Sequence, residues 1–195
     1  MSKRIFDFTA ALLGLLVLAP LFAAIALWIK LDSRGPVFFR QQRIGKDGVP
    51  FDIIKFRTMQ DEAHETLLTI GHDRRITAAG KFLRRHKLDE FPQLFNVVMG
   101  NMSLVGPRPE VPRYVDCYPP EVRKTVLSVM PGITDWASIY YKEENSLLSR
   151  SSNPEQAYLE TILPAKLKYN LRYVQERSFW NDVRIIFITL SLLLR

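Results

Sequence analysis

A long apolar segment near the N-terminus dominates the pattern of hydrophobic and polar positions. Residues 10–29 read AALLGLLVLAPLFAAIALWI and contain no charged side chain. At about 1.5 Å of rise per residue, a helix of this length matches a hydrocarbon core of roughly 30 Å. The pattern therefore predicts a membrane segment.

Pro20 and the flanking charges argue against a straight crossing. Pro20 removes a backbone hydrogen bond in the middle of the segment and favours a bend after Ala19. Positive charge prefers the cytoplasmic side of a membrane, yet cations lie at both ends: Lys3, Arg4, Lys30, Arg34, Arg40 and Arg43. We therefore expect a re-entrant helix hairpin that bends at Ala19–Pro20. An ordinary kinked transmembrane helix and a cleaved signal peptide remain alternatives.

Two short β-rich runs follow Gly35–Pro36. The runs VFFRQQRIG and VPFDIIKFR flank Lys46–Asp47–Gly48, and an Asp-Gly pair in this position is a strong hairpin signal. Along the second run, the two-residue period of a strand puts Lys55 and Arg57 on one face. That pair forms either a cationic site or an ordinary solvated face.

Most of the remaining chain is predicted to be helical. We expect helices over residues 61–69, 77–87, 154–176 and 178–195, with a break or kink at Pro164. Residues 130–134 are expected to form a turn, and residues 145–152 are the least ordered by composition. The apolar run 185–194 is too short to span a membrane, so the last helix is either interfacial or part of a core.

An acidic pair, Asp89–Glu90, is predicted at the N-terminus of one more short helix. Pro92 is tolerated only in a first helical turn, and Gly100 is a suitable end. Acidic residues in this position often cap the helix and complement its dipole. The alternative is a functional pair that holds a divalent cation or attacks an electrophile.

Arg108 lies between two prolines in the stretch SLVGPRP. Pro107 and Pro109 favour extended backbone and limit how far the arginine can move. Such rigidity suits phosphate binding, although a proline-rich connector with an exposed arginine has the same pattern.

Composition narrows the class of protein. The chain has 195 residues, a net charge of +7 and a single cysteine, Cys117. One cysteine excludes an intramolecular disulfide scaffold, and the three histidines have no zinc-finger spacing. The hydrophobic fraction of 47% is sufficient for a folded core. These residues alone indicate a basic, membrane-attached domain with a candidate anion site.

The motifs together resemble the bacterial sugar transferase family, the monotopic phosphoglycosyl transferases. The resemblance covers nearly the whole chain and rests on GPVFFRQQRIGKDGVPFDIIKFRTM, TAAGKFLRRHKLDEFPQLFNVVMGNMSLVGPRPE and MPGIT. It implies transfer of a sugar-1-phosphate from a UDP-sugar to a polyprenol phosphate, with undecaprenyl phosphate as the expected acceptor, and with Mg²⁺ as cofactor. UMP would be released in this first membrane step of glycoconjugate synthesis.

The resemblance also implies roles for individual residues. Asp89 would be the nucleophile that forms a phosphosugar-aspartate intermediate, and Glu90 would be its partner in holding Mg²⁺. A carboxylate nucleophile with a hard cation suits phosphoryl transfer, which depends mainly on alignment and charge neutralisation. The phosphate-binding cations would be Lys55, Arg57, Arg84, Arg85 and Arg108.

Four positions depart from the family pattern. The helix break is Ala19–Pro20 where the family often has Ser-Pro, so no serine hydroxyl can satisfy the freed carbonyl. The family's Pro-Gly-x-Thr-Gly-Trp-x-Gln pattern lacks its second glycine and its glutamine here. An acidic residue of the nucleotide site is replaced by Asn170. We expect Thr134 and Asn170 to contact the nucleotide.

We therefore predict an α/β, mainly helical monotopic membrane protein with interfacial amphipathic helices. Residues 1–34 would form the re-entrant anchor, and residues 35–195 a catalytic domain at the cytoplasmic face of the bacterial inner membrane, including the interfacial helix 178–195. The expected partners are the UDP-sugar, polyprenol phosphate and the lipid bilayer, without nucleic acid, and a homodimer is left open. The rival is a non-enzymatic, basic, membrane-tethered binding protein, which needs no Asp-Glu pair.

Overall fold

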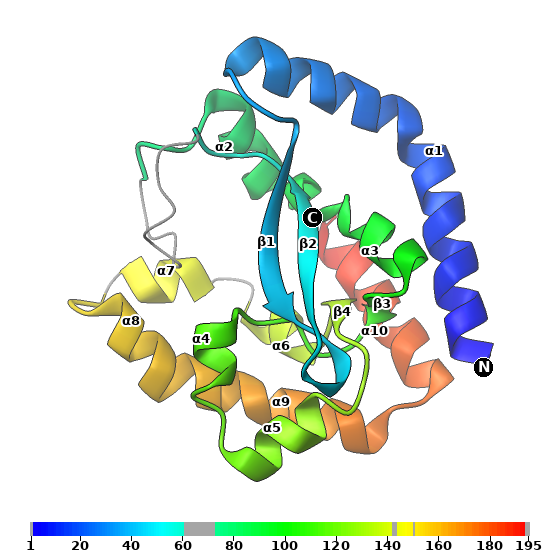
Figure 1. Ribbon diagram of the computed structural model, residues 1–195, viewed down its shortest axis with the longest axis vertical. Coiled ribbons are helices and arrows are strands. Elements are labelled where there is room, and N and C mark those ends of the chain that lie inside the picture. Colours follow the sequence, from blue (N-terminus) through cyan, green and yellow to red (C-terminus); the bar gives the residue numbers. More distant parts are fainter. Residues whose placement is uncertain (1, 61–72, 142–143, 150, 194–195) are drawn as a thin grey trace.

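The computed structural model describes residues 2–60, 73–141, 144–149 and 151–193. The helix predicted over residues 61–69 lies outside this part of the chain. The described residues form a mainly helical domain with two small two-stranded sheets (Figure 1), so the predicted mainly helical α/β class is confirmed. The helices are α1 Ser2–Asp32, α2 Ala78–Arg85, α3 Gln93–Met99, α4 Pro112–Val115, α5 Pro120–Val126, α6 Trp136–Tyr140, α7 Glu144–Ser149, α8 Pro154–Ala157, α9 Leu163–Glu176 and α10 Phe179–Leu193.

The predicted hairpin is present. Strands β1 Phe38–Ile44 and β2 Pro50–Phe56 pair antiparallel, from Phe38 opposite Phe56 to Ile44 opposite Pro50. The connection is a short 3₁₀ turn in which both Asp47 and Gly48 have positive φ. Asp and Gly are the residues that tolerate this left-handed backbone, which is why the pair predicted the turn.

A second sheet was not predicted. Strand β3 Ser103–Val105 pairs in parallel with β4 Gly132–Thr134, so the turn expected over residues 130–134 is wrong for its last three residues. Glycine is needed where the two strands approach, because a Cβ on Gly132 would lie 2.0 Å from the Gly106 nitrogen. The local Pro-Gly pattern indicates a turn, whereas the pairing comes from a distant part of the chain.

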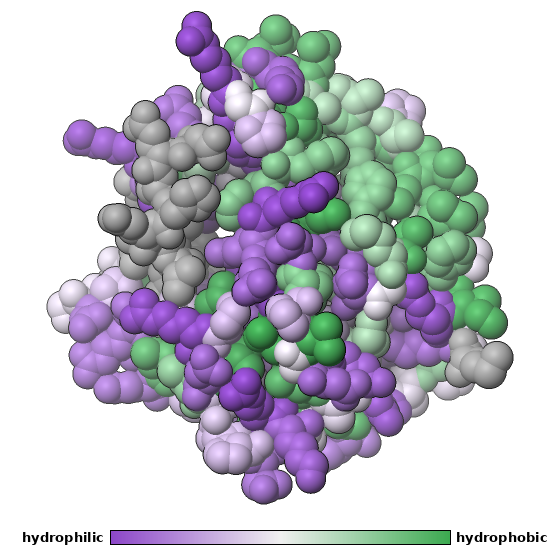
Figure 2. Space-filling model, viewed as in Figure 1, coloured by the Kyte–Doolittle hydropathy of each residue, from purple (hydrophilic) through white to green (hydrophobic). Residues whose placement is uncertain are grey.

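Helix α1 is continuous through Pro20 and bends as it passes along one side of the domain (Figure 1). Its inner face packs against the domain and includes the buried residues Ala11, Phe22, Ile25 and Ile29. Its outer face is exposed and apolar, as Figure 2 shows along the same side of the molecule: Leu12, Leu13, Leu16, Val17, Leu27 and Leu31. The helix is long and apolar enough to cross a membrane.

Side chains at both ends of α1 form hydrogen bonds or ion pairs with the rest of the domain. At the start, Lys3 Nζ lies 2.6 Å from Asp182 of α10, and Arg4 donates to the Val97 and Val98 carbonyls at the end of α3. At the other end, Asp32 accepts a hydrogen bond from the Ala79 amide in the first turn of α2. The two halves of the bent helix therefore share one supporting domain.

Arg57 also secures the end of α1. Its guanidinium donates to the carbonyls of Pro36 at 2.6 Å, Arg34 at 2.6 Å and Ser33 at 3.0 Å. The side chain is buried and lies just beyond β2. A planar group with N–H donors on three nitrogens is well suited to bind three carbonyls that follow the end of a helix.

The helices near the C-terminus follow the prediction in outline. Pro164 lies near the start of α9, and a π-helical turn, Tyr158–Ile162, leads directly into that helix. The regular α-helix is thus interrupted just before the proline, where a break or kink is predicted. Part of the stretch expected to be least ordered forms α7. In α10, Ile185 is fully buried, whereas Trp180 and Phe187 are exposed, so one face joins the core and the other is open.

We predict that Arg57→Lys destabilises the protein. Each of the three guanidinium nitrogens binds a different carbonyl, whereas the donors of lysine all lie on one nitrogen, so the free energy of unfolding should fall by about 2–3 kcal/mol. Thermal unfolding in detergent micelles measures the change. Arg40→Lys, at an exposed position on β1, is the control. Equal unfolding temperatures for the two variants would contradict this role of Arg57.

Candidate active site

The acidic pair lies in a 3₁₀ turn, Leu88–Glu90, directly before α3. The turn follows Lys87, which has positive φ and redirects the chain after α2. Pro92 is the N-terminal boundary of α3, as its fixed φ and missing amide require. No side chain caps the α3 N-terminus in the described structure, so the pair is not explained as a helix cap.

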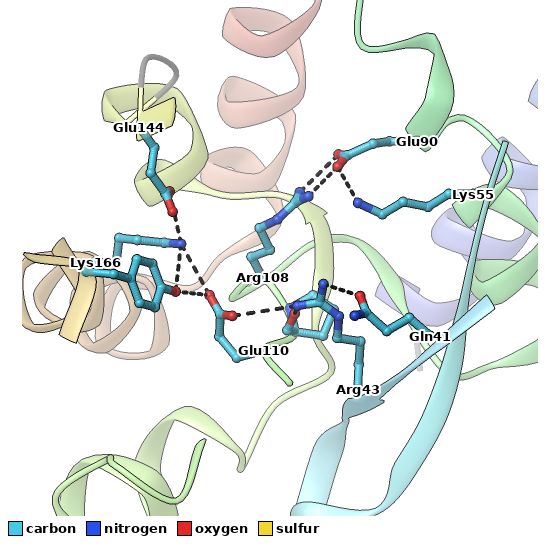
Figure 3. Close-up of polar contacts among 10 residues, drawn as sticks. Gln41, Arg43, Lys55, Glu90, Arg108, Glu110, Glu144 and Lys166 are labelled. Carbon is cyan, nitrogen blue, oxygen red and sulfur yellow. Dashed lines mark hydrogen bonds and ion pairs between the residues drawn. The ribbon is translucent and has the colours of Figure 1, made fainter. Parts of the chain in front are cut away.

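Glu90 is bound by two cations from different elements (Figure 3). Lys55 Nζ, from β2, donates to Oε1 at 2.8 Å, and Arg108 binds both carboxylate oxygens, with Nη1 3.0 Å from Oε2. Burial by itself raises the pKa of the Glu90 carboxyl, but Arg108 and Lys55 outweigh it and hold that pKa well below its usual range. Glu90 is therefore a fixed negative charge.

Asp89 is in the opposite situation. Its Oδ1 is buried and has no hydrogen-bond partner among the described residues. Burial, followed by the adjacent charge of Glu90, raises the pKa of the Asp89 carboxyl, while Lys55 and Arg84 act against the rise. Two neighbouring carboxyls thus have pKa values displaced in opposite directions, an arrangement typical of functional sites. Within the described residues, Glu90 forms ion pairs and Asp89 forms none.

The segment that carries Arg108 is held from both sides. The Arg108 amide donates to Asp135 Oδ2 at 3.4 Å, and Asp135 in turn caps α6 by accepting from the Ser138 amide. On the other side, Arg43 donates from Nη1 to the Pro109 carbonyl at 3.2 Å. The predicted rigidity around Arg108 is therefore reinforced by tertiary contacts.

A second charged network lies next to this segment (Figure 3). Glu110 accepts from Tyr158 at 2.7 Å and Lys166 at 3.2 Å, and it forms an ion pair with Arg43 at 3.6 Å. Lys166 also binds Glu144 of α7 at 3.2 Å. Burial raises the pKa of the Glu110 carboxyl, but Lys166 and Arg43 outweigh it and lower that pKa.

Sequence reasoning missed this network. Arg43 was noted only as a charge flanking the apolar segment, and Glu110, Glu144 and Lys166 were not noted. The only local signal was that Glu110 follows the rigid Arg108 segment. Its cationic partners come from β1 and α9, so no spacing in the sequence could indicate them.

The other predicted site residues lie in different surroundings. Arg84, on α2, is half-buried and its charge acts on Asp89, whereas Arg85 is exposed. The Arg57 guanidinium is bound to the end of α1 and is not brought to Glu90. The Thr134 hydroxyl bonds that of Thr189 on α10 at 2.7 Å. Asn170 is buried on α9, and its Oδ1 has no partner within the described ranges.

Comparison with known proteins identifies the family. The sequence model described as "Bacterial sugar transferase" matches residues 1–195. This chain belongs to the bacterial sugar transferase family. The expectation from the motifs is thereby confirmed, and the acid pair and its cations lie within the matched region.

Three relatives illustrate the likeness. A UDP-glucose:undecaprenyl-phosphate glucose-1-phosphate transferase of Escherichia coli is 38% identical over 96% of this chain and 39% of its own length. A UDP-N-acetylgalactosamine-undecaprenyl-phosphate N-acetylgalactosaminephosphotransferase of Aeromonas hydrophila is 36% identical over 98% of this chain and 43% of its own length. The uncharacterised sugar transferase EpsL of Bacillus subtilis is 35% identical over 96% of this chain and 84% of its own length. The chain thus spans less than half of the first two proteins.

The acid pair fits Mg²⁺ only if a phosphate substrate and water supply the other ligands. Across the described part of the chain, no group of three or more His, Cys, Asp or Glu side chains is placed to hold a metal ion. Mg²⁺ commonly binds one or two carboxylates together with substrate phosphates and water, however. The half-buried carboxylate of Asp89 is a suitable hard ligand, whereas Glu90 is already bound by cations. The residues fit a metal that arrives with a phosphate substrate.

We predict that Glu110→Gln lowers the free energy of unfolding at neutral pH. We also expect that free energy to change less with pH in the acidic range than it does in the parent protein. Removing the charge leaves Lys166 and Arg43 without their main buried partner, which should cost about 3–5 kcal/mol at neutral pH. Because the folded-state pKa of Glu110 is lowered, its contribution is complete above the ordinary value of 4.5 and is lost as the pH falls through the folded-state value.

Thermal unfolding from about pH 3 to about pH 7, a range that covers the titration of carboxyl groups, measures both effects. Glu121→Gln, exposed on α5, is the control and should follow the parent protein. An unchanged pH dependence in Glu110→Gln would show that this carboxyl does not couple to folding.

Proposed function

We propose that the chain is a phosphoglycosyl transferase. It moves a sugar-1-phosphate from a UDP-sugar to a polyprenol phosphate, with undecaprenyl phosphate as the acceptor, and releases UMP as the first membrane step of glycoconjugate synthesis. The observation that carries the proposal is the half-buried Asp89, whose Oδ1 is buried and has no described partner, beside a Glu90 that is bound by Lys55 and Arg108. The names of the E. coli and Aeromonas relatives supply the substrate class.

The first step is attack by a carboxylate oxygen of Asp89 on the phosphorus that carries the sugar. The new bond is between Asp89 Oδ2 and phosphorus, and the bond from that phosphorus to the oxygen of UMP breaks, with the electron pair leaving on UMP. A phosphosugar-aspartate remains. Such a step requires alignment and charge neutralisation more than proton transfer, which suits a site built from fixed cations.

The second step releases the aspartate. A phosphate oxygen of the polyprenol phosphate attacks the phosphorus of the intermediate, and the bond to Asp89 breaks to restore the carboxylate. The product is a polyprenol diphosphate sugar. The reaction needs no second enzyme residue as a nucleophile.

Lys55 and Arg108 bind the phosphate groups in this scheme. Arginine offers two parallel N–H donors to phosphate oxygens, and lysine offers a compact charge. Glu90 keeps both cations in place and lowers their combined charge, so that the nucleotide product can leave. Arg84 adds positive charge near Asp89. Mg²⁺ bound at Asp89, with Glu90 next to it, would neutralise phosphate oxygens.

We also propose that α1 enters the bilayer and returns to the cytoplasmic face of the inner membrane. The contacts of Arg4 with α3 and of Asp32 with α2 support this topology, because both ends of the helix are held by one domain. A polyprenol phosphate keeps its chain in lipid and its phosphate at the surface, whereas the nucleotide sugar comes from water. A domain held at the interface can bind both.

We predict that purified protein releases UMP from at least one UDP-sugar when Mg²⁺ and polyprenol phosphate are present. Asp89→Asn should lower this rate by on the order of 10³-fold or more, because the amide is not a nucleophile. Mass spectrometry of trapped protein should find the phosphosugar adduct on Asp89. Asp116→Asn, an exposed position after α4, serves as the control and should retain the rate. A non-enzymatic tether would release no UMP with any donor.

The topology proposal has its own test. In a Cys117→Ser background, single cysteines at Ser2 and Lys46 should both react with a membrane-impermeant thiol reagent only when the cytoplasmic side is accessible. Both positions are exposed in the folded domain, so burial will not prevent labelling. Labelling of the two positions from opposite sides would indicate a membrane-spanning helix.

A further inference from the structure

Glu90, Gln93 and Asn96 lie in one row along a helical segment. The backbone stays helical from the 3₁₀ turn through Phe91 and Pro92 into α3, with the Leu94 amide donating to the Phe91 carbonyl at 3.0 Å. Side chains three positions apart on such a segment are neighbours on the same face. The row therefore runs from the acid pair into α3.

Both ends of this row contact β2. Glu90 binds Lys55, and Asn96 accepts from the Ile54 amide at 2.9 Å and donates to the Asp52 carbonyl at 2.7 Å. Gln93 lies between them, on the side of α3 that faces β2. By this spacing it lies between the acid pair and the contact of Asn96 with β2.

The side chain of Gln93 is fully buried, yet neither its Oε1 nor its Nε2 has a partner among the residues that the structure describes. Buried amides are almost always hydrogen-bonded, as both polar atoms of Asn96 are one turn later. A buried amide with two unused groups is unfavourable for folding alone, and such groups are often retained for function.

Asp89 carries the complementary unused atom. Its Oδ1 is a buried acceptor without a described partner, and Asp89 precedes Gln93 by four positions on the same helical segment. Side chains with this spacing are also neighbours. This spacing puts a buried N–H donor and a buried carboxylate oxygen on the same side of the segment, and neither atom has a described partner.

We propose that Gln93 is a positioning residue for Asp89, an inference that rests on the function proposed above. During the reaction, Gln93 Nε2 donates a hydrogen bond to Asp89 Oδ1 and so directs Oδ2 toward phosphorus. When Oδ2 forms its bond to phosphorus and UMP leaves with the electron pair, Oδ1 becomes the carbonyl oxygen of the mixed anhydride. It continues to accept the same N–H, so no proton is transferred in the step.

The test compares two substitutions on the same face of α3. Gln93→Met keeps the shape of the side chain and removes both polar atoms, whereas Asn96→Leu removes an amide whose bonds to β2 are present in the resting structure. The measurements are the thermal unfolding midpoint in detergent, kcat and KM for UMP release, and the rate of adduct formation on Asp89 without acceptor lipid.

We expect Gln93→Met to lower kcat and the adduct rate by about tenfold or more, as the loss of one orienting hydrogen bond does, and to leave KM for the UDP-sugar within about twofold. Its unfolding midpoint should equal or exceed that of the parent protein, because an unpaired buried amide has been removed. Asn96→Leu should lower the midpoint.

Four results would overturn the inference. A normal kcat in Gln93→Met would mean that the amide plays no part in the reaction, and an increase in KM alone would mean that it contacts the donor instead. A fall in the unfolding midpoint like that of Asn96→Leu would mean that Gln93 is a structural residue. Absence of UMP release by the parent protein with every donor would refute the proposed function itself, and with it this role.

Discussion

The bonds from Glu90 to Lys55 and Arg108 are the interaction on which the rest of the site depends. They join β2, the turn before α3 and the segment after β3. Two cations confined together away from bulk water repel each other and lose hydration, which is tolerated only when an anion is held between them. One carboxylate therefore sets the distance between a strand and a loop that are far apart in the sequence.

The two members of the acid pair show how adjacent residues acquire different chemistry. They have the same functional group and lie in the same turn, so the difference comes from their surroundings. Glu90 meets cations on both oxygens, and Asp89 has a buried oxygen without a described partner. Burial that is compensated by cations keeps the Glu90 carboxyl ionised, and burial that is less compensated raises the pKa of the Asp89 carboxyl. Two residues in one turn thereby suit the two different roles proposed for them.

Local chemistry made several elements predictable. The Asp47–Gly48 turn and the start of α3 at Pro92 depend on backbone preferences of those residues, which neighbours modify little. The apolar segment of α1 was evident for the same reason. Each of these features is determined by a short stretch of consecutive residues, and such a stretch can be read directly from the sequence.

Contacts between distant segments were not predictable. The strand at Gly132 exists because Gly106 allows a backbone to approach it, and nothing near Gly132 indicates that partner. Arg57 was assigned to phosphate binding by motif, but its guanidinium is engaged by carbonyls that follow α1. The buried position of Glu110 likewise depends on cations from two other elements. The sequence shows the type of each residue, but it does not show which distant residue each one contacts.

The attachment of α1 at both ends has a consequence for how such a protein accommodates lipid. A free apolar helix adapts to a thicker or thinner bilayer by tilting. Here Lys3 and Arg4 hold one end and Asp32 the other, so the angle between the two arms is set by the domain beneath them. In the proposed re-entrant topology the lipid, and not the helix, must deform, so a protein built this way should be sensitive to the thickness of the leaflet that it enters.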